Sequence, residues 1–314
     1  MLSEITLQMC IVRSSIVAII VLSACASGLG TTIADYDVVH AKGRVTGELR
    51  IHDLESRIFR NTRKLRVLLP PGYDFPENQR RMYPVLYLND GQNLFDSTTA
   101  IFGPAEWRVD ETVADLVAQG AIPPMIVVGI DNAGRRGRAH EYLRYPDEFL
   151  SPPEPTPRGS AYPDFLAREV VPFVSSRYRV SADPKDVGIG GSSYGGLAAL
   201  YAAVIHPEIF GLLLAESPSL YVDHRHALRD IQRQPANLSR IYLGVGSNEE
   251  GRRDCEEAAA ETSEPVTDVR RLERILREKG MDTSRLRVVV VPCAIHEERA
   301  WAGRLPAALK FLFR

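Results

Sequence analysis

Residues 190–196 read Gly-Gly-Ser-Ser-Tyr-Gly-Gly and lie between an apolar run that ends at residue 189 and a small-residue stretch, 197–201. Within them, residues 191–195 fit the pattern G-x-S-x-G, in which a tight turn between a strand and a helix pushes the oxygen of the central serine outward. Glycine tolerates the main-chain angles of such a turn and lets helix and strand approach closely. The pattern therefore predicts strand, turn and helix, and it selects Ser193 over Ser192 as a candidate nucleophile. A tight turn without chemistry is the alternative; a phosphate-binding loop is disfavoured because the lysine of a P-loop is missing.

On both sides of this turn, apolar strands alternate with helical stretches. We expect strands at 48–51, 64–69, 83–88, 125–130, up to 189, at 240–245 and at 286–291, and helices at 108–119, 162–178, 194–205, 268–279 and toward 314. This alternation predicts an α/β fold in one domain, with a mostly parallel central sheet. Residues 146–159 hold five prolines, a composition that predicts a surface loop at the rim of a site.

A serine hydroxyl becomes a nucleophile when a base takes its proton and an acid orients that base. His296 follows the expected strand 286–291 within five residues, and active groups gather beyond the carboxyl ends of parallel strands. The acid is expected after the preceding strand, where Glu249 is the first choice and Glu250 and Asp254 are alternatives. The alternative, that Glu249 is an ordinary loop residue without a catalytic role, remains open.

Composition and spacing limit the other classes of function. A chain of 314 residues with 45% hydrophobic residues can bury one substantial core, and a formal net charge of -2 offers no field that would gather nucleic acid. His224 and His226 have the spacing of metal ligands, but no cysteine or acidic cluster supports them, so we expect a solvated loop. Residues 296–300 fail the H-E-x-x-H zinc pattern at the last position. We therefore predict neither a metal nor a cofactor.

The first 25 residues are typical of a secretory signal. Arg13 precedes an apolar run, 16–22, that is too short to span a bilayer. Leu-Ser-Ala-Cys at 22–25 resembles the lipobox of bacterial lipoproteins, so we expect residues 1–24 to be removed and Cys25 to carry a lipid anchor. A plain signal peptide is the alternative. In the oxidising periplasm that this predicts, Cys255 and Cys293 are left to form a disulfide or to remain free thiols.

From about residue 50 onward the chain resembles the "Putative esterase" family of α/β-hydrolases, whose members include enterochelin esterases and feruloyl esterases. Five features carry the resemblance: RVLLPPGY at 66–73, YPVLYLNDGQ at 83–92, Trp107, the glycine-serine turn at 191–196, and His296 with Trp301 and Arg304. Asn89 stands where the family often has histidine. The resemblance implies an α/β-hydrolase fold with helices on both faces of the sheet. Together with the N-terminal signal, it gives a lipoprotein signal peptide at 1–24, a tether at 25–43 and a single esterase domain at 44–314.

The resemblance also implies a serine carboxylic-ester hydrolase. Ser193, His296 and Glu249 would form the triad, and the main-chain N–H groups of Gln92 and Tyr194 would form the oxyanion hole. An acyltransferase with the same triad and a non-catalytic ligand-binding lipoprotein are the alternatives.

The expected substrate is a small-molecule ester of a siderophore, a carbohydrate or another compound. Trp107, Tyr142 and the proline-rich segment 146–159 are candidates to line its pocket. Arg135, with Arg136 and Arg138, is a candidate to steer an anionic substrate, although three arginines in a glycine-containing loop more often form a solvated face.

Overall fold

The computed structural model describes residues 36–39, 44–152, 156–234, 237–253, 255 and 261–314. The expected signal peptide, its lipid-bearing Cys25 and most of the expected tether lie outside the described residues. Across the described ranges, no helix is both long enough and apolar enough to cross a membrane.

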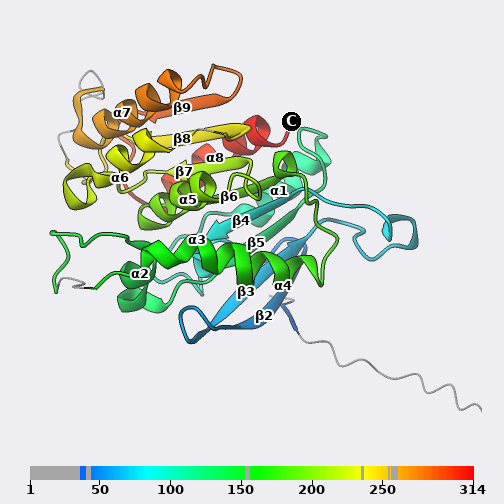
Figure 1. Cartoon of the computed structure of the whole chain (residues 1–314). Coiled ribbons are helices and arrows are strands. Elements are labelled where there is room, and N and C mark those ends of the chain that lie inside the picture. The colour runs from blue at the N-terminus through cyan, green and yellow to red at the C-terminus, as the bar shows by residue number, and fades with distance from the viewer. Residues whose placement is uncertain (1–35, 40–43, 153–155, 235–236, 254, 256–260) are drawn as a thin grey trace, which may run out of the picture. The chain divides into compact units, whose positions relative to one another are not determined.

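Nine strands of the described chain form one sheet in the order β1-β2-β3-β5-β4-β6-β7-β8-β9 (Figure 1). The strands are β1 (Asp37–Val39), β2 (Glu48–Ser56), β3 (Asn61–Leu69), β4 (Val85–Asn89), β5 (Ile126–Ile130), β6 (Val187–Ser192), β7 (Leu212–Glu216), β8 (Arg240–Gly246) and β9 (Leu286–Val291). β1, β2, β3 and β5 pair antiparallel, whereas β5, β4 and β6 to β9 pair parallel. The carboxyl ends of the six parallel strands therefore meet at one edge, where the candidate residues were expected.

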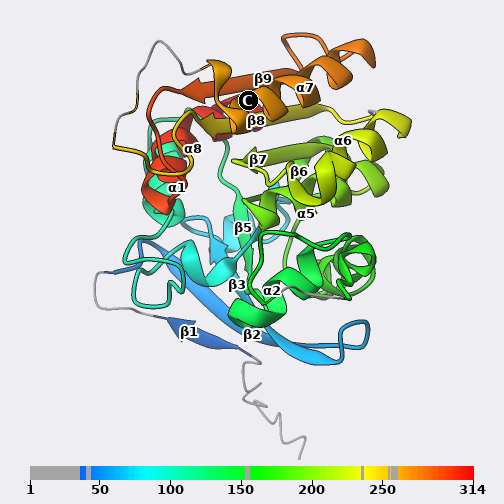
Figure 2. The same ribbon diagram turned by 90° about the vertical axis from the view of Figure 1, so that its left-hand side faces the viewer.

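Helices cover both faces of the sheet (Figure 2). α1 (Val109–Ala118) and α8 (Glu298–Leu312) pack on one face. The other face is covered by α2 (Gly134–Tyr142), α3 (Tyr162–Phe165), the π-helical η4 (Leu166–Val170), α4 (Val171–Ser175), α5 (Tyr194–Ile205), α6 (Val222–Arg233) and α7 (Glu264–Glu278). Short 3-10 turns are η1 (Pro76–Asn78), η2 (Gly91–Asn93), η3 (Gly159–Ala161) and η5 (Pro184–Asp186).

Two apolar cores lie between the sheet and its helices, one on each face of the sheet. Along β4, Val85 and Tyr87 belong to the core under α2–α7, whereas Leu86 and Leu88 belong to the core under α1 and α8. This alternation follows from the two-residue period of a strand. A strand that is apolar at every position is thus buried on both faces, as a parallel sheet requires.

The fold class is confirmed, but two strands and two helices were not predicted. β1 and β7 were missed, the arginine-rich segment 134–142 is helix α2 instead of a loop, and the expected loop around His224 and His226 belongs to α6. Asp223, His224 and Arg225 have positive φ angles inside α6, so the chain turns sharply there before the regular helix. Among the described residues, no group of three or more side chains is arranged to hold a metal ion.

Candidate active site

Ser193 lies at the turn from β6 to α5. Its φ of 58° and ψ of -128° are unusual for a residue other than glycine. The flanking glycines leave no room for a side chain. A Cβ on Gly191 would lie 2.7 Å from the carbonyl of Gly195, and one on Gly195 would lie 2.8 Å from Asp90 Oδ2. Ser192 is only 5% exposed and ends the strand, whereas Ser193 is partly exposed. The turn thus presents the second serine.

Two neighbouring strands bring His296 and Glu249 together. Glu249 lies three residues beyond β8 and His296 five residues beyond β9, and the two strands pair in parallel. His296 Nδ1 is hydrogen-bonded to Glu249 Oε2. Because an ionised carboxylate only accepts hydrogen bonds, Nδ1 is the donor of this pair, and in the neutral imidazole Nε2 is then the acceptor. Of the alternative acids, Glu250 is exposed and pairs with Arg252 at 3.6 Å, and Asp254 lies outside the described residues.

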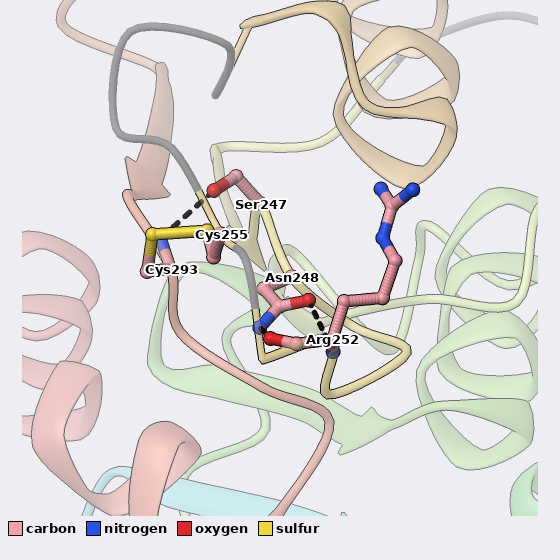
Figure 3. Close-up of a disulfide and its surroundings, with 5 residues drawn as sticks. All are labelled: Ser247, Asn248, Arg252, Cys255 and Cys293. Carbon is pink, nitrogen blue, oxygen red and sulfur yellow. Dashed lines mark hydrogen bonds between the residues drawn. A yellow bond between two sulfur atoms is a disulfide. The ribbon is translucent and has the colours of Figure 1, made fainter.

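A disulfide between Cys255 and Cys293 links the two loops that carry this pair (Figure 3). Its Cα atoms are 5.7 Å apart, which lies within the normal range for such a bridge. Cys293 N donates to Ser247 Oγ at 2.8 Å, and the Asn248 side chain bonds both the N–H and the carbonyl of Arg252 at 2.8 Å. The alternative of two free thiols is therefore excluded.

Two cavities meet at Ser193 and His296, which line both. The first cavity, of about 450 Å³, is also lined by Phe149, Ser217, Leu220, Tyr221, Val245 and Glu249. The second, of about 420 Å³, is also lined by Asn93, Phe102, Trp107, Arg138, Glu298 and Trp301. A reacting bond held at Ser193 would therefore have room for one group on each side.

The candidate oxyanion donors lie on adjacent turns. Gln92 belongs to η2, directly after β4, and Tyr194 is the first residue of α5, directly after β6. β4 and β6 are parallel neighbours, so both turns lie at the same edge of the sheet. The N–H of Tyr194 has no intrahelical acceptor, because the first N–H groups of a helix lack one. Asn132 N donates to Gln92 Oε1 at 3.1 Å, which holds the side chain of Gln92 in the core.

Arg138 and Tyr142 both contact Asp90 beneath this edge; Arg138 also lines the second cavity, whereas Tyr142, contrary to the prediction, lines neither. Arg138 donates to both carboxylate oxygens of Asp90, at 2.8 and 2.7 Å, and its carboxylate partner raises the pKa of the buried guanidinium against the effect of burial. Tyr142 is 1% exposed, and its hydroxyl accepts from Asp90 N at 3.2 Å. Arg138 thus does not form a solvated face, and Tyr142 supports the turn at Asp90 instead of lining a cavity.

Of the other two residues predicted to contact the substrate, one lines a cavity and the other does not. Trp107 lines the second cavity, with its ring centroid 5.7 Å from that of Trp301. Arg135 is exposed, donates to the carbonyl of Ile101 and is not among the described residues that line either cavity.

The proline-rich segment forms part of the rim, as far as it is described. Phe149 is 75% exposed and lines the first cavity. The segment is anchored by Asp147, whose buried carboxylate accepts from the hydroxyls of Tyr194 and Tyr221. Residues 153–155 lie outside the described residues.

Two residues at the site were missed. Glu298, beside His296, lines the second cavity and accepts from Asn93 Nδ2 at 3.1 Å; burial raises the pKa of its carboxyl. Ser217 donates to Glu249 Oε1 at 2.8 Å, and Gly246 N donates to the same oxygen at 2.6 Å. Neither belongs to a sequence motif.

Comparisons with known proteins show which family the chain belongs to. The family model Esterase, described as "Putative esterase", matches residues 56–312. The uncharacterized protein YbbA of Bacillus subtilis (strain 168) is 23% identical over 253 residues, which cover 80% of this chain and 92% of YbbA. The iron(III) enterobactin esterase of Escherichia coli (strain K12) is 30% identical over 137 residues, covering 44% of this chain and 30% of that protein.

Solved structures show the same fold. The crystal structure of the enterobactin esterase FES from Shigella flexneri superimposes with a TM-score of 0.66 at 21% sequence identity. The match covers 87% of this chain and 61% of the Shigella chain.

Proposed function

The chain belongs to the "Putative esterase" family and is a carboxylic-ester hydrolase of the α/β-hydrolase fold, and we propose that it acts through Ser193, His296 and Glu249 by way of an acyl-enzyme. The contact of His296 Nδ1 with Glu249 Oε2, at the edge where Ser193 is presented, is the observation that carries this proposal.

The first half of the reaction forms the acyl-enzyme. Ser193 Oγ attacks the ester carbonyl carbon while His296 Nε2 takes the hydroxyl proton, and Glu249 stabilises the resulting imidazolium. The carbonyl oxygen becomes an oxyanion that accepts hydrogen bonds from the N–H groups of Gln92 and Tyr194. One such donor contributes about 3–4 kcal/mol to the stabilisation of the transition state. The C–O bond then breaks, and the alcohol leaves with the proton from His296.

The second half repeats these roles with water. His296 takes a proton from water, whose oxygen attacks the acyl carbon, and Ser193 leaves with that proton. The two cavities support an ester with a sizeable group on each side of the reacting bond. The names of the relatives support a siderophore ester or another small-molecule ester as the substrate.

We further propose that the protein works outside the cytoplasm, in the periplasm, and is tethered by a lipid on Cys25. The Cys255–Cys293 disulfide supports an oxidising compartment. Metabolic labelling with a fatty acid should mark the full chain but not its Cys25→Ala variant; equal labelling of both would contradict the anchor.

Hydrolysis of p-nitrophenyl acetate tests the nucleophile. We expect Ser193→Ala to lower kcat by on the order of 10⁴-fold or more, because removal of a triad member leaves only binding and oxyanion stabilisation. Ser192→Ala, which removes the neighbouring hydroxyl, should retain turnover. Equal activity of Ser193→Ala and the unmodified chain would overturn the proposal.

A further inference from the structure

Ser217 lies next to the acid, but the proposed reaction assigns it no role. It directly follows β7, is 4% exposed and has a φ of 43°. Such a φ is rare for a serine and persists only where the surroundings hold it. Here the N–H of Ser217 donates to the carbonyl of Gly244 in β8 at 2.7 Å. The backbone is thus held so that the hydroxyl lies between β8 and α8.

Two obligate donors contact this hydroxyl. Trp301 Nε1 lies 3.0 Å from Ser217 Oγ, and Arg304 Nη2 lies 3.4 Å from it. An indole N–H and a guanidinium can only donate, and a serine hydroxyl has two acceptor positions and one proton. Both acceptor positions are therefore occupied, and the single proton can be directed only at Glu249 Oε1, 2.8 Å away.

The donors are themselves held in place. Trp301 and Arg304 are three residues apart on α8, so they share one face of that helix. Arg304 Nε donates to the buried carboxylate of Glu216 at 2.6 Å. The Trp301 ring also packs edge-on against the His296 ring, with centroids 5.1 Å apart. Consequently, α8 contacts both the Ser217 hydroxyl, through Trp301 and Arg304, and the His296 ring, through Trp301.

We propose that Ser217 is a positioning residue for the triad: its hydroxyl, oriented by Trp301 and Arg304, fixes Glu249 so that the other carboxylate oxygen faces His296 Nδ1. With Oε1 bonded by Ser217 and Gly246, Oε2 remains for the imidazole. This inference rests on the proposed triad, because Ser217 acts only through Glu249.

A double-mutant cycle tests the inference with p-nitrophenyl acetate. We expect Ser217→Ala to lower kcat about tenfold with KM unchanged, the size that one lost hydrogen bond to a charged group gives. Ser217→Gly removes the same hydroxyl while easing the positive φ, so it should show the same loss. In a Glu249→Ala background, which removes the acceptor of the Ser217 hydroxyl, both substitutions should have no further effect on kcat.

A matched control is Ser181→Ala, which removes another serine hydroxyl that donates to a carboxylate, that of Asp186 at 2.9 Å, outside the site. Its kcat should be unchanged. Full activity of Ser217→Gly, or an equal loss with and without Glu249, would overturn the positioning role while Ser193→Ala stays inactive. Full activity of Ser193→Ala would instead overturn the proposed triad itself.

Discussion

Removing the Cys255–Cys293 disulfide should destabilise the protein by a predictable amount. The bridge joins residues 38 positions apart, with the segment that carries the whole of α7 between them. In the chain-entropy model, a closed loop of this length lowers the entropy of the unfolded chain by about 13 cal/mol/K, which corresponds to about 4 kcal/mol at 25 °C. The free energy of unfolding of a protein is typically about 5–15 kcal/mol, so the disulfide would account for a large part of it.

The assay is urea unfolding of the full chain and of the Cys255→Ala/Cys293→Ala double variant, followed by circular dichroism. Both bridge cysteines are replaced so that neither bridge partner is left as a lone thiol. The midpoint of the variant should fall, and dithiothreitol should lower the midpoint of the unmodified chain to the same value without affecting the variant. An unchanged midpoint in the variant, or a response of the variant to dithiothreitol, would refute the reasoning.

Two further substitutions probe the surroundings of the acid. Gly246→Ala should lower kcat strongly, because its Cβ would lie 2.9 Å from Glu249 Oε1 and would overlap the Ala294 carbonyl, whereas Gly303→Ala, which meets nothing within 4 Å, should be active in the same ester assay. Burial raises the pKa of Glu216 to about 7 even though the Arg304 guanidinium opposes that rise. Arg304→Met should therefore raise this pKa further and, at a pH above the raised pKa, such as about pH 9, reduce the free energy of unfolding by about 3–5 kcal/mol. As the pH falls below the raised pKa, the native state of the variant takes up a proton before that of the unmodified chain does, and the unfolded state, with a pKa of about 4.3, does not bind it. Part of the loss should therefore be recovered by about pH 5.5, where Glu216 is protonated in both native states. Urea midpoints at both pH values check this, and a pH-independent loss would contradict it.

The parts of the fold that depend on local chemistry could be predicted from the sequence. The turn at Ser193 leaves no room for a Cβ at Gly191 or Gly195, and this local requirement for glycine appears in the sequence as a motif. The parallel strands β8 and β9 are largely apolar runs, so their carboxyl ends, and with them Glu249 and His296, could be assigned to one edge.

The missed elements depend on partners far away in the chain. Segment 134–142 carries three arginines and two glycines, and it reads as a loop because no local feature shows that Arg138 pairs with Asp90, 48 residues earlier. Tyr142 is buried against the same distant residue, because its hydroxyl accepts from Asp90 N. Local propensity therefore could not predict α2, which is stabilised by tertiary contacts.

Ser217 was missed for a related reason. A single serine after a five-residue strand has no pattern, and its role arises from Glu249, Trp301 and Arg304, which lie 32 to 87 residues further along the chain. The sequence could indicate the groups that we propose to react, but not the buried groups that we propose to orient them.

Covalent labelling of the full chain with a fluorophosphonate tests the central claim most directly. Such a probe reacts with an activated serine, and fragmentation mass spectrometry between residues 192 and 193 can assign the adduct to one of them. The account predicts one adduct on Ser193, much slower labelling in His296→Ala, and none on Ser192. An adduct on Ser192, or no adduct on a folded protein, would contradict it.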